Sequence, residues 1–395
     1  MDIDRLRSET PGCQERIHLN NAGSALMPEP VVRAIQDHIA LESRIGGYEA
    51  HDERRDAIEG AYRAVAELLA SAAANIAFTD NATASFMQAL SSIPFRRGDV
   101  ILTTRNDYIS NQIQFLSLEK RLGVEVVRAP DAIEGGVDAA AMADLIRLRR
   151  PMLVCVTHVP TNSGLVQDVA AIGAACREHD VLYLIDACQS IGQMPIDVNR
   201  LGCDYLSASS RKFLRGPRGA GFLYVSDRVL DGGLEPLFID MRGADWIAEN
   251  RYRPAAGARR FETWEFAWAL VLATGEAARY ATAIGLEAIR DRARSLAERL
   301  RRALAEIEGV RVLDRGRELC AIVTTAIEGR DPAQVMRALR ARRINTTAQI
   351  REHALIDYDD KGVAASLRLS PHYYNTEDEI DRAVVALREL LRQSG

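Results

Sequence analysis

The run VLYLIDACQS at residues 181–190, followed by CDYLSASSRKFLRGPRGAGFLYV at residues 203–225, decides the fold of this chain. The segment VLYLI is apolar or aromatic at every position, which is typical of a central parallel strand that helices cover on both faces. Polar residues follow each strand at once: Asp186 follows the first, and a Ser-Ser-Arg-Lys run follows the second. Ligand sites in parallel α/β sheets lie beyond the carboxyl ends of the strands. We therefore expect a site where these two strands end.

The sequence before and between these runs alternates between strand and helix patterns. Further strand patterns occupy 75–80, 99–104, 124–129, 151–159 and 219–226. Helical patterns occupy 30–42, 53–71, 82–93, 110–121, 142–150 and 169–180. Strands that alternate with helices predict an α/β fold with a mainly parallel sheet.

The character of the sequence changes after residue 265, where helical patterns dominate. Helices are predicted at 267–285, 286–307, 331–343 and 377–393, with short strands at 310–314 and 319–327. This pattern predicts a smaller α+β C-terminal domain at 266–395 after a large α/β domain at 16–265. We expect residues 1–15 to pack against the smaller domain.

Composition excludes several classes of function. The chain of 395 residues has a net charge of −5 and no basic run, so no nucleic-acid surface is expected. Its N-terminus is polar and no apolar stretch approaches about 20 residues, which predicts a cytoplasmic protein without a membrane partner. Six cysteines occur without a CxxC pair, so we interpret them as buried free thiols, with no metal site expected.

Lys212 is the candidate nucleophile. The neutral amine of a lysine forms a Schiff base with a carbonyl cofactor, and the adjacent Arg211 favours the neutral amine. The chain has only three lysines. Lys120 lies on a charged helical face and Lys361 in the acidic run DYDDKG, so a Schiff base, if one forms, is on Lys212. Asp186 is suited to hold a pyridine nitrogen protonated, which makes such a ring an electron sink.

A second strand end offers a place for a phosphate. The segment Asp80-Asn81-Ala82-Thr83 follows the strand at 75–80 and opens a helix. Free amides at a helix N-terminus and a threonine hydroxyl both suit an anion. An ordinary helix cap would have the same sequence, so this motif supports a phosphate site only in combination with the other motifs.

Taken together, DACQSIGQ (186–193) and DYLSASSRKFLRGPRGAGFLYV (204–225) resemble the class V aminotransferases. This fold-type-I family depends on pyridoxal 5'-phosphate (PLP) and includes cysteine desulfurases, selenocysteine lyases, isopenicillin N epimerase and carbon–sulfur lyases. The resemblance covers nearly the whole chain, through HLNNAGSALMPEPV, IAFTDNATASFMQAL, THVPTNSGLVQ and SLRLSPHYYNTEDEIDR. It implies a mainly parallel seven-stranded sheet, an amino-acid substrate and a homodimer with active sites at the subunit interface.

The resemblance also implies roles for single residues around PLP. Lys212 would carry the cofactor and act as the catalytic base, while Asp186 would pair with the pyridine nitrogen. Gln189 would bind the phenolic oxygen with help from Thr161, and Tyr108 would stack on the ring where desulfurases have histidine. The phosphate would be held by the Ala82 backbone, Thr83, Ser209 and Arg211.

The same resemblance assigns the substrate side of the site. Arg368, in SLRLSPHYYNT, would clamp the α-carboxylate. Asn21, Ala22 and Gly23 would line the substrate mouth, and Tyr48 in GGYEA would face the active site. The segment 347–362 would close over the substrate, where Arg351 and His353 are candidates for distal contacts.

The sequence departs from the desulfurases in two places. Desulfurases need a cysteine shortly before the carboxylate-binding arginine, yet residues 344–368 contain none. The nearest upstream cysteine, Cys320, lies in an apolar strand-like run and is expected in the core. Desulfurases also have Gly-Thr after Arg-Phe-Glu, whereas Thr263-Trp264-Glu265 follows here, as in the epimerase-like and carbon–sulfur-lyase branch.

These observations favour a PLP-dependent lyase that cleaves the carbon–sulfur bond of a cysteine S-conjugate, its sulfoxide or cystine. An amino-acid epimerase and a class V aminotransferase remain alternatives, and a cysteine desulfurase or selenocysteine lyase ranks below them. An epimerase needs a second base opposite Lys212, for which Tyr108, Tyr48 and His353 are candidates. A non-catalytic PLP-binding regulator and a nucleotide-binding protein rank last, since the site is chemically complete and no GxGxxG or P-loop run occurs.

Overall fold

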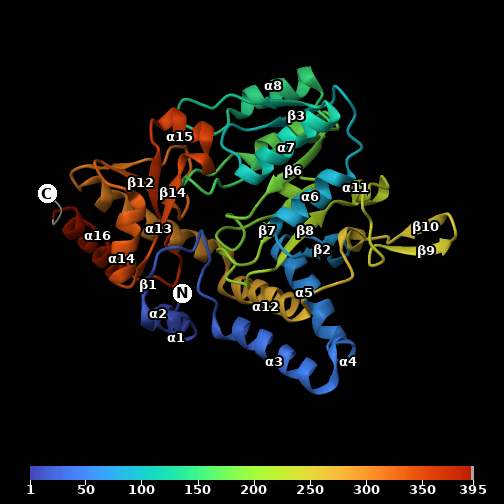
Figure 1. The fold of residues 1–395 in the computed structure, drawn as a ribbon, viewed down its shortest axis with the longest axis horizontal. Coiled ribbons are helices and arrows are strands. Elements are labelled where there is room, and N and C mark those ends of the chain that lie inside the picture. The colour runs from blue at the N-terminus through green and yellow to red at the C-terminus, as the bar shows by residue number, and fades with distance from the viewer. Residues whose placement is uncertain (393–395) are drawn as a thin grey trace.

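A seven-stranded sheet forms the centre of the computed structural model, which describes residues 1–392 (Figure 1). The strand order is β2-β8-β7-β6-β5-β3-β4. Only β8 runs antiparallel to its neighbours within this sheet, which confirms the predicted mainly parallel arrangement. The bounds are β2 Ile76–Thr79, β3 Val100–Thr103, β4 Glu125–Arg128, β5 Leu153–Thr157, β6 Leu182–Asp186, β7 Tyr205–Ser209 and β8 Gly221–Val225.

Both faces of the central strands are buried, as the sequence of β6 predicted. Leu184 packs into one apolar cluster and Ile185 into the other, because successive side chains of a strand point to opposite faces. One cluster includes side chains of α6 (Ala82–Ser92) and α7 (Ile109–Leu122). The other includes side chains of α5 (Arg55–Leu68), α8 (Ala139–Arg149), α9 (Val169–Glu178) and α12 (Trp268–Ile284).

The C-terminal region contains a four-stranded antiparallel sheet of order β11-β12-β15-β14. Its strands are β11 Val310–Val312, β12 Val323–Ile327, β14 Thr347–Ile350 and β15 Ala365–Leu369. Its helices are α13 Leu286–Ala305, α14 Pro332–Ala341, α15 Leu355–Lys361 and α16 Glu377–Arg392. The strand predicted at 319–327 begins only at Val323, because the amides of Cys320 and Ala321 donate to Gly164 and Gln193 outside this sheet.

The N-terminal segment lies against the C-terminal region (Figure 1). Arg7 pairs with Glu379 at 2.9 Å, and β1 (Ile17–His18) runs parallel to β13 (Ile344–Asn345). Helix α12 packs on α3 (Glu29–Ile45) and α5, so it contacts the region before residue 265. The division at residue 265 therefore stays a prediction.

The remaining elements are short. They are α1 Ile3–Ser8, α2 Gly12–Glu15, α4 Gly47–Glu53, α10 Val198–Leu201, α11 Asp227–Asp231, β9 Ala244–Ala248 and β10 Arg251–Pro254. The β9–β10 hairpin projects from the body of the molecule (Figure 1). Within residues 1–392, no helix has both the length and the apolar character that crossing a membrane requires.

Candidate active site

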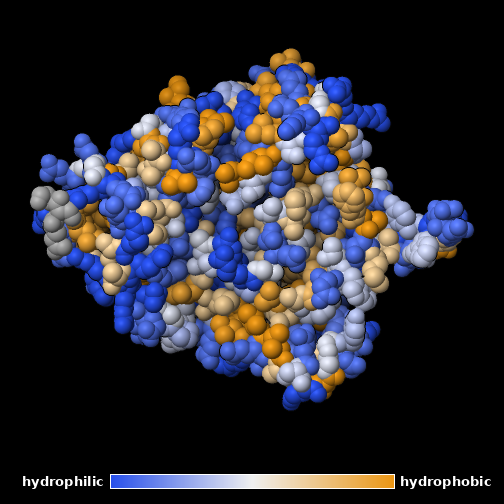
Figure 2. All heavy atoms as spheres, in the orientation of Figure 1, coloured by the Kyte–Doolittle hydropathy of each residue, from blue (hydrophilic) through white to orange (hydrophobic). Residues whose placement is uncertain are grey.

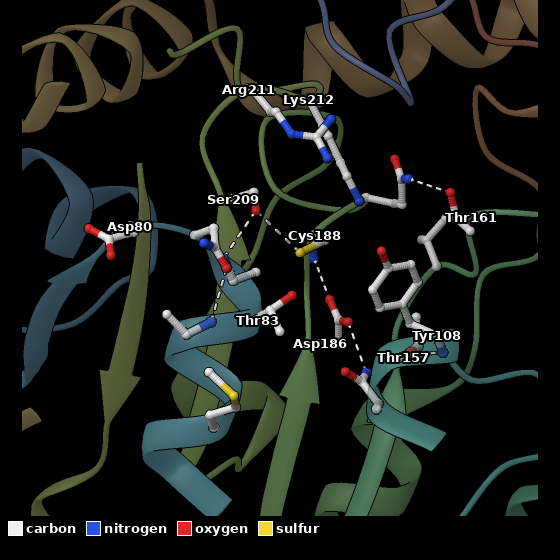
Figure 3. Close-up of a pocket in the computed structure, with 17 residues that line it drawn as sticks. Asp80, Thr83, Tyr108, Thr157, Thr161, Asp186, Cys188, Ser209, Arg211 and Lys212 are labelled. Carbon is white, nitrogen blue, oxygen red and sulfur yellow. Dashed lines mark hydrogen bonds between the residues drawn. The ribbon is translucent and has the colours of Figure 1, made fainter. Parts of the chain in front are cut away.

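A cavity of about 590 Å³ opens where β5, β6 and β7 end (Figure 3). Because β2 and β3 end at the same edge, the segments that follow them bring α6 and Tyr108 to this cavity. Nine of its lining residues are those that the family resemblance assigns to the cofactor: Ala82, Thr83, Tyr108, Thr161, Asp186, Gln189, Ser209, Arg211 and Lys212.

Lys212 lies just beyond β7 and is buried against the cavity. Its Nζ makes no hydrogen bond or ion pair with any side chain in residues 1–392 and lies 5.8 Å from the centroid of the Tyr108 ring. Burial lowers the pKa of Lys212, and the nearby Arg211 and Arg368 lower it further, against the opposing effect of Asp186. A neutral amine at neutral pH is the form that attacks a carbonyl group.

Arg215 fixes the loop that carries Lys212. Its guanidinium is fully buried and donates to the Leu26 carbonyl at 2.8 Å, to Thr10 Oγ1 at 2.6 Å and to the Tyr373 hydroxyl at 2.5 Å. These three acceptors come from the N-terminal segment and from the segment after β15. The position of Lys212 therefore depends on contacts between parts of the chain that are far apart in sequence.

Asp186 ends β6 and points into the cavity (Figure 3). Its carboxylate accepts hydrogen bonds from the Cys188 amide at 2.9 Å and from Asn111 Nδ2 at 3.0 Å. Tyr108 is the N-cap residue of α7, and it lines the cavity together with Asp186. A carboxylate held in this way is placed to bind a protonated ring nitrogen.

The start of α6 forms the other end of the cavity. The Ala82 amide donates to Ser209 Oγ at 3.2 Å, and the Thr83 hydroxyl has no partner within the described residues. Gly221 permits this approach, because a Cβ at that position would lie 2.8 Å from the Ala82 nitrogen. Arg211 donates to the Gly23 carbonyl and has no carboxylate partner in residues 1–392. Amides, hydroxyls and an unpaired guanidinium suit a phosphate.

Gln189 and Arg368 meet at Thr161. Gln189 Nε2 donates to Thr161 Oγ1 and to the Ala22 carbonyl, both at 3.0 Å, while its buried Oε1 has no partner in the described part of the chain. Arg368 donates to Thr161 Oγ1 at 2.7 Å and to Asn20 Oδ1 at 3.3 Å. No carboxylate within residues 1–392 pairs with Arg368. Both side chains thus retain binding capacity for a ligand.

None of the predicted substrate residues is among those that line the cavity, and Arg368 reaches it only through its contact with Thr161. Asn21 Nδ2 donates to the Ser370 carbonyl and Asn21 Oδ1 accepts from the Tyr374 hydroxyl, so both polar atoms of this side chain are used in contacts within the protein. Ala22 and Gly23 contribute carbonyl oxygens to Gln189 and Arg211. Tyr48 is 75% exposed and lines a separate surface groove with Trp264, so the structure does not bring it to the cavity of its own chain.

The structure places several residues of segment 347–362 differently from what the sequence predicted. Arg351 forms a bidentate pair with Asp359, and His353 is exposed; neither lines the cavity. Lys361, which the sequence places in an acidic run, is buried at the end of α15, where its ammonium pairs with Asp357 at 2.7 Å. The i, i+4 spacing of this pair was visible in the sequence, but its burial was not.

Three residues of the site were missed from sequence: Asp107, Asn111 and Cys188. Cys188 lines the cavity with its Sγ 3.9 Å from Ser209 Oγ, and burial together with Asp186 raises its pKa to about 12. Its place two residues after Asp186 was a usable signal. Among residues 1–392, no three His, Cys, Asp or Glu side chains are placed to hold a metal ion.

Comparison with known families matches residues 17–383 to the family described as Aminotransferase class-V. The chain belongs to the aminotransferase class-V family. This confirms the resemblance seen in the sequence motifs. PLP is the cofactor of this family and therefore of this class V enzyme. The residues present fit PLP: within residues 1–392, Lys212 has no ion partner, the buried Gln189 Oε1 has no hydrogen-bond partner, and the Thr83 hydroxyl at the start of α6 is unpaired.

Two relatives that align over nearly the whole class V enzyme have different names: one is named as a desulfurase and the other as a lyase. A protein of Methanothermobacter thermautotrophicus named "Probable cysteine desulfurase" is 29% identical, covering 99% of this chain and 98% of its own. A protein of Mycobacterium tuberculosis named "Probable hercynylcysteine sulfoxide lyase" is 30% identical, covering 97% and 92%. The apo structure of a cysteine desulfurase from Thermococcus onnurineus superposes with a TM-score of 0.91 at 26% identity, covering 99% and 98%.

Proposed function

We propose that this class V enzyme is a β-lyase that cleaves the carbon–sulfur bond of a cysteine S-conjugate, its sulfoxide or cystine. The products would be pyruvate, ammonia and the released sulfur compound. The names of the relatives support carbon–sulfur cleavage in general, because they include both desulfurases and a sulfoxide lyase. The choice of β-elimination rests on the cysteines of this chain.

The segment before Arg368 lacks a cysteine that could accept sulfur from a substrate, and this observation carries the proposal. Residues 344–368 contain no cysteine, and all six thiols of the chain are buried. Only Cys188 lines the cavity, and its pKa of about 12 leaves almost no thiolate at neutral pH. A persulfide-forming step therefore lacks its nucleophile, whereas elimination requires only that the sulfur group depart with its electron pair.

The contacts described above support the following roles. Arg368 would bind the substrate carboxylate, and the amine of Lys212, buried against the cavity, would remove the Cα proton as a base. Asp186 keeps a proton on the ring nitrogen, and bound PLP supplies the sink for the electrons of the Cα–H bond. The Cβ–S bond then breaks with its electron pair on sulfur. The 2-aminoacrylate that leaves takes up water to give pyruvate and ammonia.

A substrate panel tests the proposal. PLP-loaded enzyme is incubated separately with cystine, cysteine S-conjugates, their sulfoxides and L-cysteine, and pyruvate, ammonia and alanine are measured. We expect equimolar pyruvate and ammonia from at least one sulfur substrate, without alanine. Alanine with released sulfur would make the protein a desulfurase, and an inverted amino acid or a 2-oxo acid that retains the sulfur would favour epimerisation or transamination.

Cys188→Ala is expected to form pyruvate and ammonia without alanine, as the wild type does. Removing one buried sulfur atom leaves a small cavity, so we expect the rate to fall by less than about fivefold. Cys155→Ala, which removes a buried thiol outside the cavity, is the matched control. Alanine that forms with the wild type and with Cys155→Ala but not with Cys188→Ala would show that this thiol accepts sulfur.

We also propose that the class V enzyme is a homodimer. Large apolar side chains are exposed around the β9–β10 hairpin and the preceding loop: Phe238 (82%), Trp246 (81%), Leu237 (70%) and Met241 (68%). A further hydrophobic patch lies over α12 and α3 (Figure 2). Exposed apolar areas of this kind mark interaction surfaces, and a second copy would cover them.

Light scattering on Phe238→Asp combined with Trp246→Asp tests this assembly. We expect the wild type to have twice the mass of one chain and the variant the mass of a single chain. Ile133→Asp is the control, because Ile133 is fully exposed and lies outside this surface. A wild-type mass of one chain would contradict the proposal.

A further inference from the structure

Two buried carboxylates flank the Asn111 amide beneath the cavity. Asn111 Nδ2 lies 3.0 Å from Asp186 Oδ2 and 3.3 Å from Asp107 Oδ1. Asp107 and Asn111 are one helical turn apart at the start of α7, while Asp186 ends β6. All three side chains are at least nine-tenths buried. One amide thus connects the carboxylate that faces the ring nitrogen to a second acid behind it.

Asp107 is held by neutral groups only. Its carboxylate accepts from Thr103 Oγ1 at 2.6 Å, from the Thr157 hydroxyl and from the Tyr108 amide at 2.8 Å. The titratable groups that act on it are Asp186 on β6 and the buried Cys155 thiol on β5, and no cation in residues 1–392 pairs with it. Burial, with a smaller effect of Asp186, raises the pKa of Asp107 to about 6. The acid is therefore largely ionised above that pH.

We propose that Asp107 is a positioning residue of the cofactor site, which orients Asp186 through Asn111 and whose negative charge strengthens proton binding at the cofactor's ring nitrogen. The proposal rests on the PLP site described above, in which Asp186 faces that nitrogen. Asp107 has a second effect through the Tyr108 amide, because the same carboxylate fixes the start of the helix that presents the Tyr108 ring.

Electrostatics supports stronger proton binding at the ring nitrogen. A second negative charge near Asp186 makes removal of the ring-nitrogen proton less favourable, and burial of both carboxylates limits the screening of their charge by water. A helix cap alone would need only the contact to the Tyr108 amide. The contact to Asn111, whose amide also binds Asp186, is what connects Asp107 to the cofactor.

The test uses enzyme loaded with PLP that carries nitrogen-15 in the ring, observed by NMR between pH 6 and 9. In the wild type we expect the ring nitrogen to be protonated at pH 6 and to lose its proton only near the upper end of this range, so that a shift of its titration is measurable. In Asp107→Asn, which keeps the shape but removes the charge, we expect about tenfold weaker proton binding, a shift of about one pH unit. We also expect weaker PLP retention on dialysis.

Asp204→Asn is the matched control, since Asp204 is a buried carboxylate at the opposite end of β7. Asn111→Ser retains the Asp107 charge but removes the bridge, and it replaces Asp107→Asn if that variant fails to fold. A ring-nitrogen signal in folded Asp107→Asn identical to wild type at every pH would overturn the proposal. An unprotonated nitrogen in the wild type at pH 6 would instead show that the cofactor placement at Asp186 is wrong.

Discussion

Lys212→Ala is expected to lose covalently held PLP and to lower turnover by roughly 10³–10⁴-fold, because in the proposed mechanism one amine both anchors the cofactor and removes the Cα proton. Lys212 is the only lysine that lines the cavity, and its Nζ has no partner among the described residues. We expect the variant to lose its visible absorbance on dialysis, while the wild type keeps it. Product release in single-turnover experiments would measure the loss of activity.

Two controls separate chemistry from folding in this experiment. Lys120→Ala removes an exposed lysine near the end of α7 and should leave both colour and turnover unchanged. An added small primary amine should partly restore proton removal in Lys212→Ala, because it supplies the missing base. Colour that survives dialysis in Lys212→Ala would contradict the assignment of the anchoring lysine.

The central sheet was predictable because its signal is local. Most of the strands contain a run of apolar residues, and parallel strands place their carboxyl ends at one edge, so the residues after Ile185 and Ala208 had to meet. The same reasoning placed Thr83 in the cavity, whereas Tyr108 was assigned through the family resemblance. The β9–β10 hairpin and β15 were not predicted, since the strand patterns around them are short.

The contacts of Asp107 and Asn111 beneath the cofactor site could not be predicted from local sequence patterns. Asn111 and Asp186 are 75 positions apart, and the contact between them depends on how α7 sits on the sheet. Asp107 precedes Tyr108, yet its sequence neighbours do not reveal that two threonine hydroxyls surround it. Tyr48 shows the converse: a family resemblance pointed to the active site, but the fold places this side chain on the surface of its own chain.

Arg368→Met is expected to lower kcat/KM by roughly 10²–10³-fold, since a bidentate bond to the substrate carboxylate is lost. Arg368 is 4% exposed, and its guanidinium bonds only to neutral groups. Burial and the nearby Arg211 lower its pKa to about 10, which reflects the cost of a charge without a counter-ion. The free protein is therefore destabilised by a group that its substrate would neutralise.

Because the unpaired charge of Arg368 costs stability, we expect Arg368→Met to lower the activity of the enzyme without lowering its stability. Without a ligand, Arg368→Met should melt at the same temperature as the wild type or higher, because an apolar side chain of similar length replaces an unpaired buried charge. A carboxylate substrate analogue should raise the melting temperature of the wild type but not of the variant. Arg260→Met is the matched control, because Arg260 is buried and bonds only backbone carbonyls far from the cavity. If analogue binding stabilised Arg368→Met as much as the wild type, the carboxylate would have to bind elsewhere, and the orientation of the substrate proposed for Lys212 would fail with it.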